Sequence, residues 1–224
     1  MSKQDFNSLD DFEQFVRSTI TPWSPRQRTA LAASMAERWL PVFEEFSEEE
    51  EWGDPATFEH AVQSVWKCVL GHELTTKDRE RHEKEVSENT PHPDDFCSDC
   101  DAVIATSAMI GWAMNCCGKA DNTHEAVMAM VCGFEAVAHN IYQNTHWNEI
   151  EGRLQQMLEL SDETMDSIRG RMESLEDLQQ TTQDDWRSPQ VRNELAKQIK
   201  LLKLIGGMVQ IDQQHIEALR EKLV

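Results

Sequence analysis

The chain has 224 residues, of which 41 are acidic and 21 basic, so its formal net charge is −20 and its pI is about 4.7. This excess of carboxylates argues against direct binding to nucleic acid, whose phosphates need clustered Lys and Arg, and against binding to an anionic membrane surface. Hydrophobic residues make up 39% of the chain, which allows a sizeable core.

Three features of the sequence predict a cytoplasmic protein with no membrane segment. The first residues lack the basic stretch followed by an apolar stretch that marks a secretory signal. No apolar run reaches the length needed to span a bilayer. The six cysteines fall mostly within apolar, helix-like stretches, so we interpret them as reduced, buried thiols rather than as a disulfide framework.

Apolar residues recur at the helical period along nearly the whole chain, and no long polar/apolar alternation predicts a strand. A first helix is predicted from Leu9 to Thr19, within an N-terminal helical extension over residues 1–22. The stretch "TPWSPRQR" then restarts the chain, with Ser24 as the helix cap and Pro25 as the first helical residue. Pro41 lies inside the following pattern and should kink or split that helix.

The same start signal recurs at Asp54 and Pro55, which predict the next helix. A polar helix rich in both charges follows over roughly Lys77 to Ser87. The most apolar helix is predicted over roughly Ser98 to Cys117. Because its middle carries almost no charge, we expect it at the centre of the fold.

Asn122 is predicted to cap the helix after that. Ser188 and Pro189 begin a long C-terminal helix over residues 189–224, which Gly206-Gly207 interrupts and can bend. We therefore predict a single all-α, bundle-like domain over residues 1–224, with about seven to nine helices.

Four stretches along the chain together resemble a known family. They are "AERWLP", "VWKCVLGHELTTKD", "PHPDDF" and "DDWRSPQV", and their order and spacing fit from about Pro25 to the C-terminus. In these the chain resembles the YjaG-like bacterial family, also described as domain of unknown function 416. The resemblance implies an all-helical, soluble, cytoplasmic bacterial protein, and it brings no established activity, cofactor or catalytic residue. Cys97 and Cys100 are not part of the family's motif.

The stretch "PHPDDFCSDCD" holds His92 and the C-x-x-C pair Cys97 and Cys100, which are candidates for a metal or redox site. A structural zinc site needs four ligands, and here one pair stands alone. Cys117 lies about 25 Å further along the same predicted helix, too far to share an ion with Cys100. The βαβ pattern of a thioredoxin-like site is missing. We therefore interpret the stretch as a helix start capped by Asp94, Asp95 or Ser98, with the thiols as small apolar fillers.

Glu135 and His139 lie at positions i and i+4 of one predicted helix, a spacing that can chelate a metal. The di-iron bundles use Glu-x-x-His, and no such companion motif occurs. An ordinary pair on a helix surface is the alternative that we favour. No zincin, nucleophile-elbow, phosphate-loop or dinucleotide motif is present, so we expect no catalytic residue, no metal and no cofactor.

The densest charge run is "EEFSEEEEW", and a second acidic pair precedes Trp186. An aromatic side chain ringed by acids could anchor a basic partner, whereas the alternative is a core tryptophan that covers a helix end. The candidate partner-binding residues are Glu44, Glu45, Glu48, Glu49, Glu50, Glu51, Trp52, Asp184, Asp185 and Trp186.

These observations predict a non-enzymatic protein-binding module. Its sharpest form is a cytoplasmic immunity protein, whose negative charge steers it onto a basic toxin domain. Two alternatives stay open. One is an unrecognised helical-bundle enzyme or metal-binding protein, and the other is a homodimeric housekeeping scaffold that pairs through its long last helix.

Overall fold

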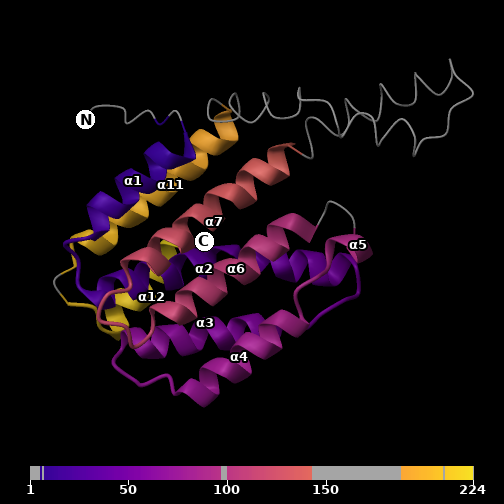
Figure 1. Cartoon of the computed structure of the whole chain (residues 1–224), viewed down its shortest axis with the longest axis horizontal. Helices are drawn as coiled ribbons and strands as arrows, with labels where there is room; N and C mark the ends of the chain where they lie inside the picture. Colours follow the sequence, from indigo (N-terminus) through magenta and orange to yellow (C-terminus); the bar gives the residue numbers. More distant parts are fainter. Residues whose placement is uncertain (1–5, 7, 97–99, 143–187, 209, 224) are drawn as a thin grey trace, which may run out of the picture.

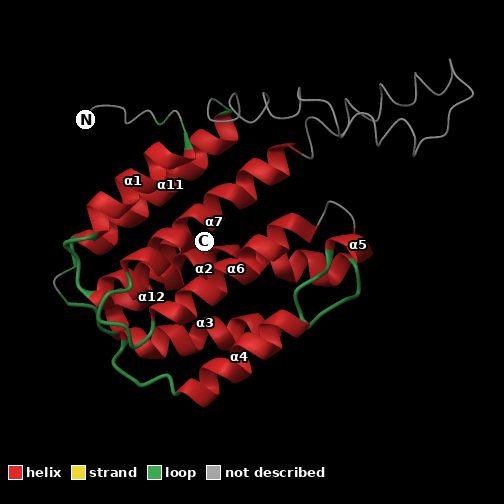
Figure 2. Ribbon diagram, viewed as in Figure 1, coloured by secondary structure: helices red, strands yellow, loops and turns green. Residues whose placement is uncertain are grey.

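The computed structural model describes residues 6, 8–96, 100–142, 188–208 and 210–223. Every regular element in these ranges is an α-helix, and none is a strand, which confirms the all-α fold class (Figure 2). The helices are α1 (Leu9–Ile20), α2 (Pro25–Glu49), α3 (Pro55–Val69), α4 (Thr76–Glu88), α5 (Pro93–Phe96), α6 (Asp101–Cys116), α7 (Thr123–Tyr142), α11 (Pro189–Gly206) and α12 (Gln213–Leu223). No helix in the described ranges combines the length and the apolar character needed to cross a bilayer.

Three predicted helix starts are confirmed at atomic detail. The Ser24 hydroxyl accepts the backbone N–H of Gln27 at 3.3 Å, and the Gln27 side chain in turn accepts the backbone N–H of Ser24 at 2.9 Å. Asp54 and Ser188 cap α3 and α11 through their side-chain oxygens, at 3.1 Å in both cases. A proline follows each of the three caps, because the first helical residue needs no N–H donor.

Helix α2 is the most enclosed element of the fold. All nine residues from 28 to 36 are buried, most of them alanines or other small residues. Around it, α6 and α7 complete the centre, α3 and α4 cover one side, and α1, α11 and α12 lie toward the other (Figure 1). Pro41 does not split α2. It is exposed, so water can reach the carbonyl that its missing N–H leaves unbonded.

Helix α6 packs against α2, α3, α4 and α7, as predicted for a central helix. Met109 is fully buried, and Ala105 and Ala108 are half-buried. The helix begins at Asp101 rather than near Ser98, and Cys100 at its cap position makes no side-chain capping bond.

The predicted caps at Asp94 and Asp95 are therefore wrong, because these residues belong to the separate short helix α5. Ser98 lies outside the described residues.

The two ends of the chain differ from the predictions. The N-terminal extension is part of the core, since Phe12, Val16 and Ile20 of α1 are fully buried. The single C-terminal helix is instead two helices. A Cβ at Gly206 would lie 2.8 Å from the Trp23 ring, so the chain passes close to α2's start there. Asp212 then starts α12 by accepting the backbone N–H of His215 at 3.0 Å.

Asn122 precedes α7 as predicted, but its side chain does not cap that helix. It is fully buried, and its Oδ1 accepts the Nε–H of the buried Arg28 at 2.8 Å. Its Nδ2, which carries two hydrogens, lies within hydrogen-bonding distance of three oxygens, Pro25 O at 3.0 Å, Thr29 Oγ1 at 2.9 Å and Cys116 O at 3.0 Å. Asn122 thus joins the start of α2 to the end of α6.

Candidate functional site

Six glutamates form an exposed acidic patch where α2 ends. Its members are Glu44, Glu45, Glu48, Glu49, Glu50 and Glu51. None of them forms an ion pair with a basic side chain in the described ranges. The last turn of α2 also contains no basic residue. The negative end of the helix dipole therefore meets further negative charge, an arrangement that lowers helix stability.

Trp52 lies beside the acidic patch and is half-buried. Its ring centroid is 6.3 Å from that of Phe46 in α2 and 5.1 Å from that of Phe96 in α5. This packing favours the interpretation of Trp52 as a side chain that covers a helix end, while part of its ring stays accessible. The other predicted partner-binding residues, Asp184, Asp185 and Trp186, lie outside the described residues.

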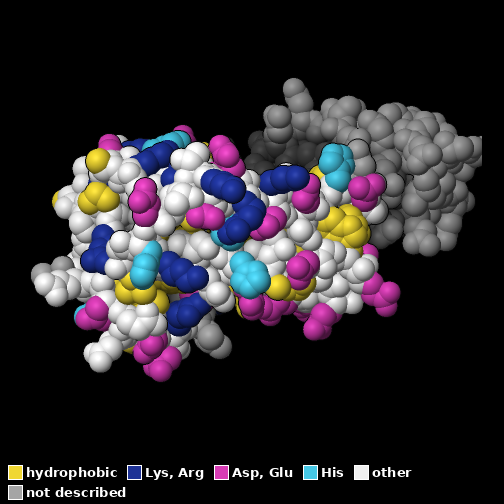
Figure 3. Space-filling model, turned by 90° about the horizontal axis from the view of Figure 1, so that it is seen from below, with side chains coloured by type: hydrophobic (Ala, Val, Ile, Leu, Met, Phe, Trp, Pro, Cys, Tyr) yellow, Lys and Arg dark blue, Asp and Glu magenta, His cyan; other side chains and the backbone are white. Residues whose placement is uncertain are grey.

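The face that carries α4 has a different charge distribution. Figure 3 views the molecule from the side on which α4 lies in Figure 1, and it shows acidic and basic side chains mixed together. On α4, Arg81 pairs with Asp78 at 3.4 Å, and Lys84 pairs with Glu88 at 3.6 Å. The charges of α4 are thus partly paired, whereas the six glutamates of the acidic patch lie close together in the sequence and have no basic partner among the described residues.

The predicted metal candidates are not brought together. In the described part of the chain, no group of three His, Cys, Asp or Glu side chains is placed to hold a metal ion. His92 is exposed, whereas Cys100 is fully buried. Glu135 is exposed on α7, and the side chain of His139 and all of Cys97 lie outside what the structure describes.

A pair of thiols that the sequence analysis did not single out lies where α3 and α6 end. Cys68 in α3 and Cys117 directly after α6 each shift the pKa of the other, while the Cys117 thiol donates a hydrogen bond to Ala113 O at 3.7 Å. The Cys117 side chain is the largest cause that lowers the pKa of Cys68, to about 6, and the Cys68 side chain in turn raises the pKa of Cys117. The backbone of Gly118 contributes to the lowering of the Cys68 pKa as well. The sequence places the two cysteines 49 positions apart, so only the folded chain brings them together.

Two arginines hold the backbone around this thiol pair. Arg79 of α4 donates to Cys117 O at 3.0 Å, and Arg26 of α2 donates to Val69 O. Both contacts place a cation at the C-terminal end of a helix, where the dipole is negative. The two guanidinium groups also help to lower the pKa of Cys68.

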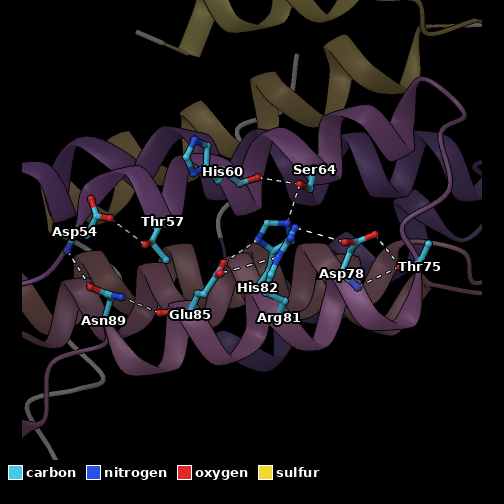
Figure 4. A network of polar contacts seen from close by, with 10 residues as sticks. All are labelled: Asp54, Thr57, His60, Ser64, Thr75, Asp78, Arg81, His82, Glu85 and Asn89. Carbon is cyan, nitrogen blue, oxygen red and sulfur yellow. Dashed lines mark hydrogen bonds and ion pairs between the residues drawn. The ribbon is translucent and has the colours of Figure 1, made fainter.

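A polar network joins α3 to α4 (Figure 4). Ser64 Oγ lies 3.0 Å from His82 Nε2, and His82 Nδ1 lies 3.4 Å from Glu85 Oε2. The order Ser, His, Glu matches that of a hydrolase triad. However, the Ser64 hydroxyl donates to His60 O at 2.9 Å, so its hydrogen does not point at the imidazole.

Ser64 also lies within α3, where helical hydrogen bonds occupy the backbone N–H groups that an oxyanion hole would need. His82 is buried, and burial is the main cause that lowers its pKa. We interpret the network as a helix-to-helix contact rather than as a catalytic site.

Comparison with known proteins places the fold but gives no activity. The model of a family described as "Protein of unknown function (DUF416)" matches residues 16–224. A solved structure of a DUF416 family protein from Shewanella baltica is similar, with 18% identity, a TM-score of 0.61 and 92% of each chain covered. No curated protein matches the chain.

Proposed function

We propose that this chain, which belongs to the DUF416 family of proteins of unknown function, is a non-enzymatic protein-binding module. In its sharpest form it is an immunity protein that binds and neutralises a bacterial toxin domain with a basic surface. The observation that supports the proposal is the acidic patch, six exposed carboxylates without an ion-pair partner among the described residues.

The position of the acidic patch supports a role outside the fold. Carboxylates at the C-terminal end of a helix oppose its dipole, so these side chains do not stabilise α2. Like charges on neighbouring turns also repel one another. A basic surface placed against the patch would relieve both effects, and the field of the patch would speed the encounter with such a surface.

The aromatic side chains next to the patch supply the second part of an interface. Trp52 and Phe96 are half-buried, so each keeps apolar surface in contact with water. A buried aromatic anchor with charges around it is a common arrangement at protein–protein contacts. We therefore place Trp52 at the centre of the proposed contact and the glutamates at its rim.

The experiment captures partners of the full chain from its native host at low salt and then measures the association rate with each purified partner. Reversal of four charges, by Glu48→Lys, Glu49→Lys, Glu50→Lys and Glu51→Lys, should lower the on-rate about tenfold or more and change the off-rate far less. Physiological salt should slow association as well, because it screens exposed charges over about 8–10 Å.

A matched control changes the net charge equally on another face. It reverses four exposed acids of α3, α4 and the segment between them, namely Glu59, Glu73, Glu80 and Glu83. If the patch is the contact, this control should retain most of the on-rate. Equal loss in both variants would mean that net charge alone steers association. Recovery of nothing but further copies of this chain would reject the proposal in favour of a homodimer.

A further inference from the structure

Helix α11 carries a group of exposed basic side chains in a chain whose net charge is −20. We call this group the basic face, and its members are Arg192, Lys197, Lys200 and Lys203. The one acidic residue of α11, Glu194, is buried and paired with Arg38. None of the four cations forms an ion pair with an acidic side chain in the described ranges. Among the described helices, α11 alone has more basic than acidic residues.

The basic face contributes little to the stability of α11. Lys203 lies in the last turn, where a cation meets the negative end of the helix dipole. Arg192 lies near the start of the helix, at the positive end, and Lys197 and Lys200 lie in the middle. The three lysines also follow one another at a spacing of three residues, so their like charges repel. Most of this positive charge therefore has no favourable partner among the described residues, as is true of the acidic patch.

The basic face and the acidic patch lie along different halves of α2. Glu194 binds Arg38, and Ile205 O accepts the side-chain N–H of Gln27 at 3.3 Å, so α11 runs antiparallel to α2 and covers its first half. Figure 1 shows the end of α11 at the left and α5, which contacts Trp52 beside the acidic patch, at the right. One chain cannot place its basic face on its own acidic patch, so the two surfaces can pair only between two copies.

The two charged surfaces match in size and in composition. At about 100° per residue, the four cations of the basic face lie within an arc of about 140° on α11. The glutamates between Glu44 and Glu49 cover an arc of about the same width on α2. Each surface also borders half-buried apolar side chains, namely Ile199 and Leu204 on α11 and Trp52 and Phe96 beside the acidic patch. Opposite charges around apolar contacts are the composition of a protein–protein interface.

We propose that the basic face of one copy binds the acidic patch of a second copy, so that the chain associates with itself through opposite charges. The lysine ammonium groups then lie on the glutamate carboxylates, and Trp52 of one copy lies against Ile199 and Leu204 of the other. The contact joins two different surfaces, so it is heterologous. The inference goes beyond the proposed function because it needs no other protein. It also limits that function, since an acidic patch covered by a second copy is closed to a basic partner.

The net charge determines the salt concentration at which copies associate. Two chains of charge −20 repel each other, and this repulsion reaches about 30 Å at about 0.01 M salt. At about 0.15 M salt the range falls to about 8 Å, so distant charges are screened while charges in contact still attract. At about 1 M salt the range of about 3 Å weakens the contacts as well. We therefore expect self-association to be strongest near physiological salt, whereas association with a basic partner weakens steadily as salt is added.

Sedimentation velocity of the full chain over a range of protein concentrations measures this association. Two variants each reverse three charges, one with Lys197→Glu, Lys200→Glu and Lys203→Glu, the other with Glu45→Lys, Glu48→Lys and Glu49→Lys. In each variant like charges face each other, so the concentration of half-association should rise about tenfold or more. A chain with all six substitutions keeps the net charge of −20 and restores opposite charges across the contact. It should therefore associate again.

The matched control reverses three exposed lysines of α3 and α4, with Lys67→Glu, Lys77→Glu and Lys84→Glu. It changes the net charge as much as the reversal of the basic face, and it should lose far less of the association. Circular dichroism checks that every variant keeps its helices. A chain that stays monomeric near physiological salt, equal loss in the control and the basic-face variant, or no recovery in the chain with six substitutions would each overturn the proposal. The on-rate with a basic partner is a separate measurement, so the proposed function stands or falls independently.

Discussion

Replacement of Asn122 by alanine tests the junction between α2, α6 and α7. The side chain is fully buried. Its oxygen accepts a hydrogen bond from the guanidinium group of Arg28, and its two N–H groups share three oxygens around the start of α2 and the end of α6. Arg28 is 6% exposed, so water cannot replace the lost acceptor. We expect Asn122→Ala to lower the free energy of unfolding substantially while leaving the helix content of the folded state unchanged.

The magnitude follows from the partners that are left behind. Loss of a hydrogen bond to a charged buried group costs about 1.5–3 kcal/mol, and each neutral bond adds about 1 kcal/mol. Two of the three oxygens, Thr29 Oγ1 and Pro25 O, retain a hydrogen bond to each other at 2.9 Å, which limits the sum. We therefore expect a loss of about 4 kcal/mol, at the upper end of single-substitution effects.

Urea unfolding followed by circular dichroism measures this loss. With a slope of about 2–3 kcal/mol per molar, the midpoint should fall by about 1.3–2 M. The matched control is Asn193→Ala, the same substitution at an exposed position of α11, which should be neutral or slightly stabilising. If Asn122→Ala shifted the midpoint no more than Asn193→Ala, the junction would not carry the stability assigned to it.

Two further predictions concern a titratable side chain and a close backbone approach. Burial lowers the pKa of His82 below 6.5, so the unfolded chain binds the proton more readily, and stability should fall as the pH drops below about 6.5. This fall, measured as the melting temperature between pH about 7.5 and 5.5, should be smaller in His82→Gln and unchanged in His60→Gln, whose histidine is exposed. Equal pH dependence in the unaltered chain and both variants would contradict the assignment of the effect to His82. Gly206→Ala should destabilise the fold by about 1–3 kcal/mol, because its Cβ would meet the Trp23 ring at 2.8 Å. At Gly207 the φ is helical, and a Cβ would meet two backbone oxygens at the ordinary contact distances of 3.5 and 3.7 Å. Gly207→Ala should therefore be neutral or stabilising in the same thermal assay, and the reverse order would refute this explanation.

Local signals in the sequence predicted the helix starts well. At α2 and α11 the serine side chain accepts an N–H group of the first turn, and the proline that follows has no N–H to satisfy, as at Ser24 with Pro25 and Ser188 with Pro189. A few adjacent residues therefore determine where each helix starts. The polar helix α4 followed from its charge pattern, and the structure adds a cap at Thr75 that was not predicted.

Contacts between distant segments could not be predicted in this way. Gly206 lies so close to the Trp23 ring that a Cβ would meet it at 2.8 Å, and Trp23 lies far earlier in the chain. Asn122 has the residue type and position of a helix cap, yet its side-chain oxygen accepts a hydrogen bond from the buried Arg28 instead.

The candidate site also combines features that a local sequence signal predicts with features that depend on distant residues. The exposure of the glutamates from Glu44 to Glu51 follows from a run of charge that no core can accommodate. The effect of Cys117 on the pKa of Cys68 has no local signature, because neither cysteine belongs to a C-x-x-C pair. The pair Cys97 and Cys100 has that signature, and the structure shows Cys100 buried at the start of α6.

The enclosure of α2 has a consequence for how the chain matures. Arg38 on this helix binds Glu194 of α11 at 2.6 and 3.0 Å, and the two residues are 156 positions apart. On the ribosome, α2 emerges long before α11 has been synthesised, so Arg38 lacks its partner and the buried residues from 28 to 36 lack part of their cover meanwhile. At about 5–20 residues per second, that interval is of the order of ten seconds or more. The nascent chain therefore exposes the apolar surface of α2 to chaperones before the later helices can pack against it.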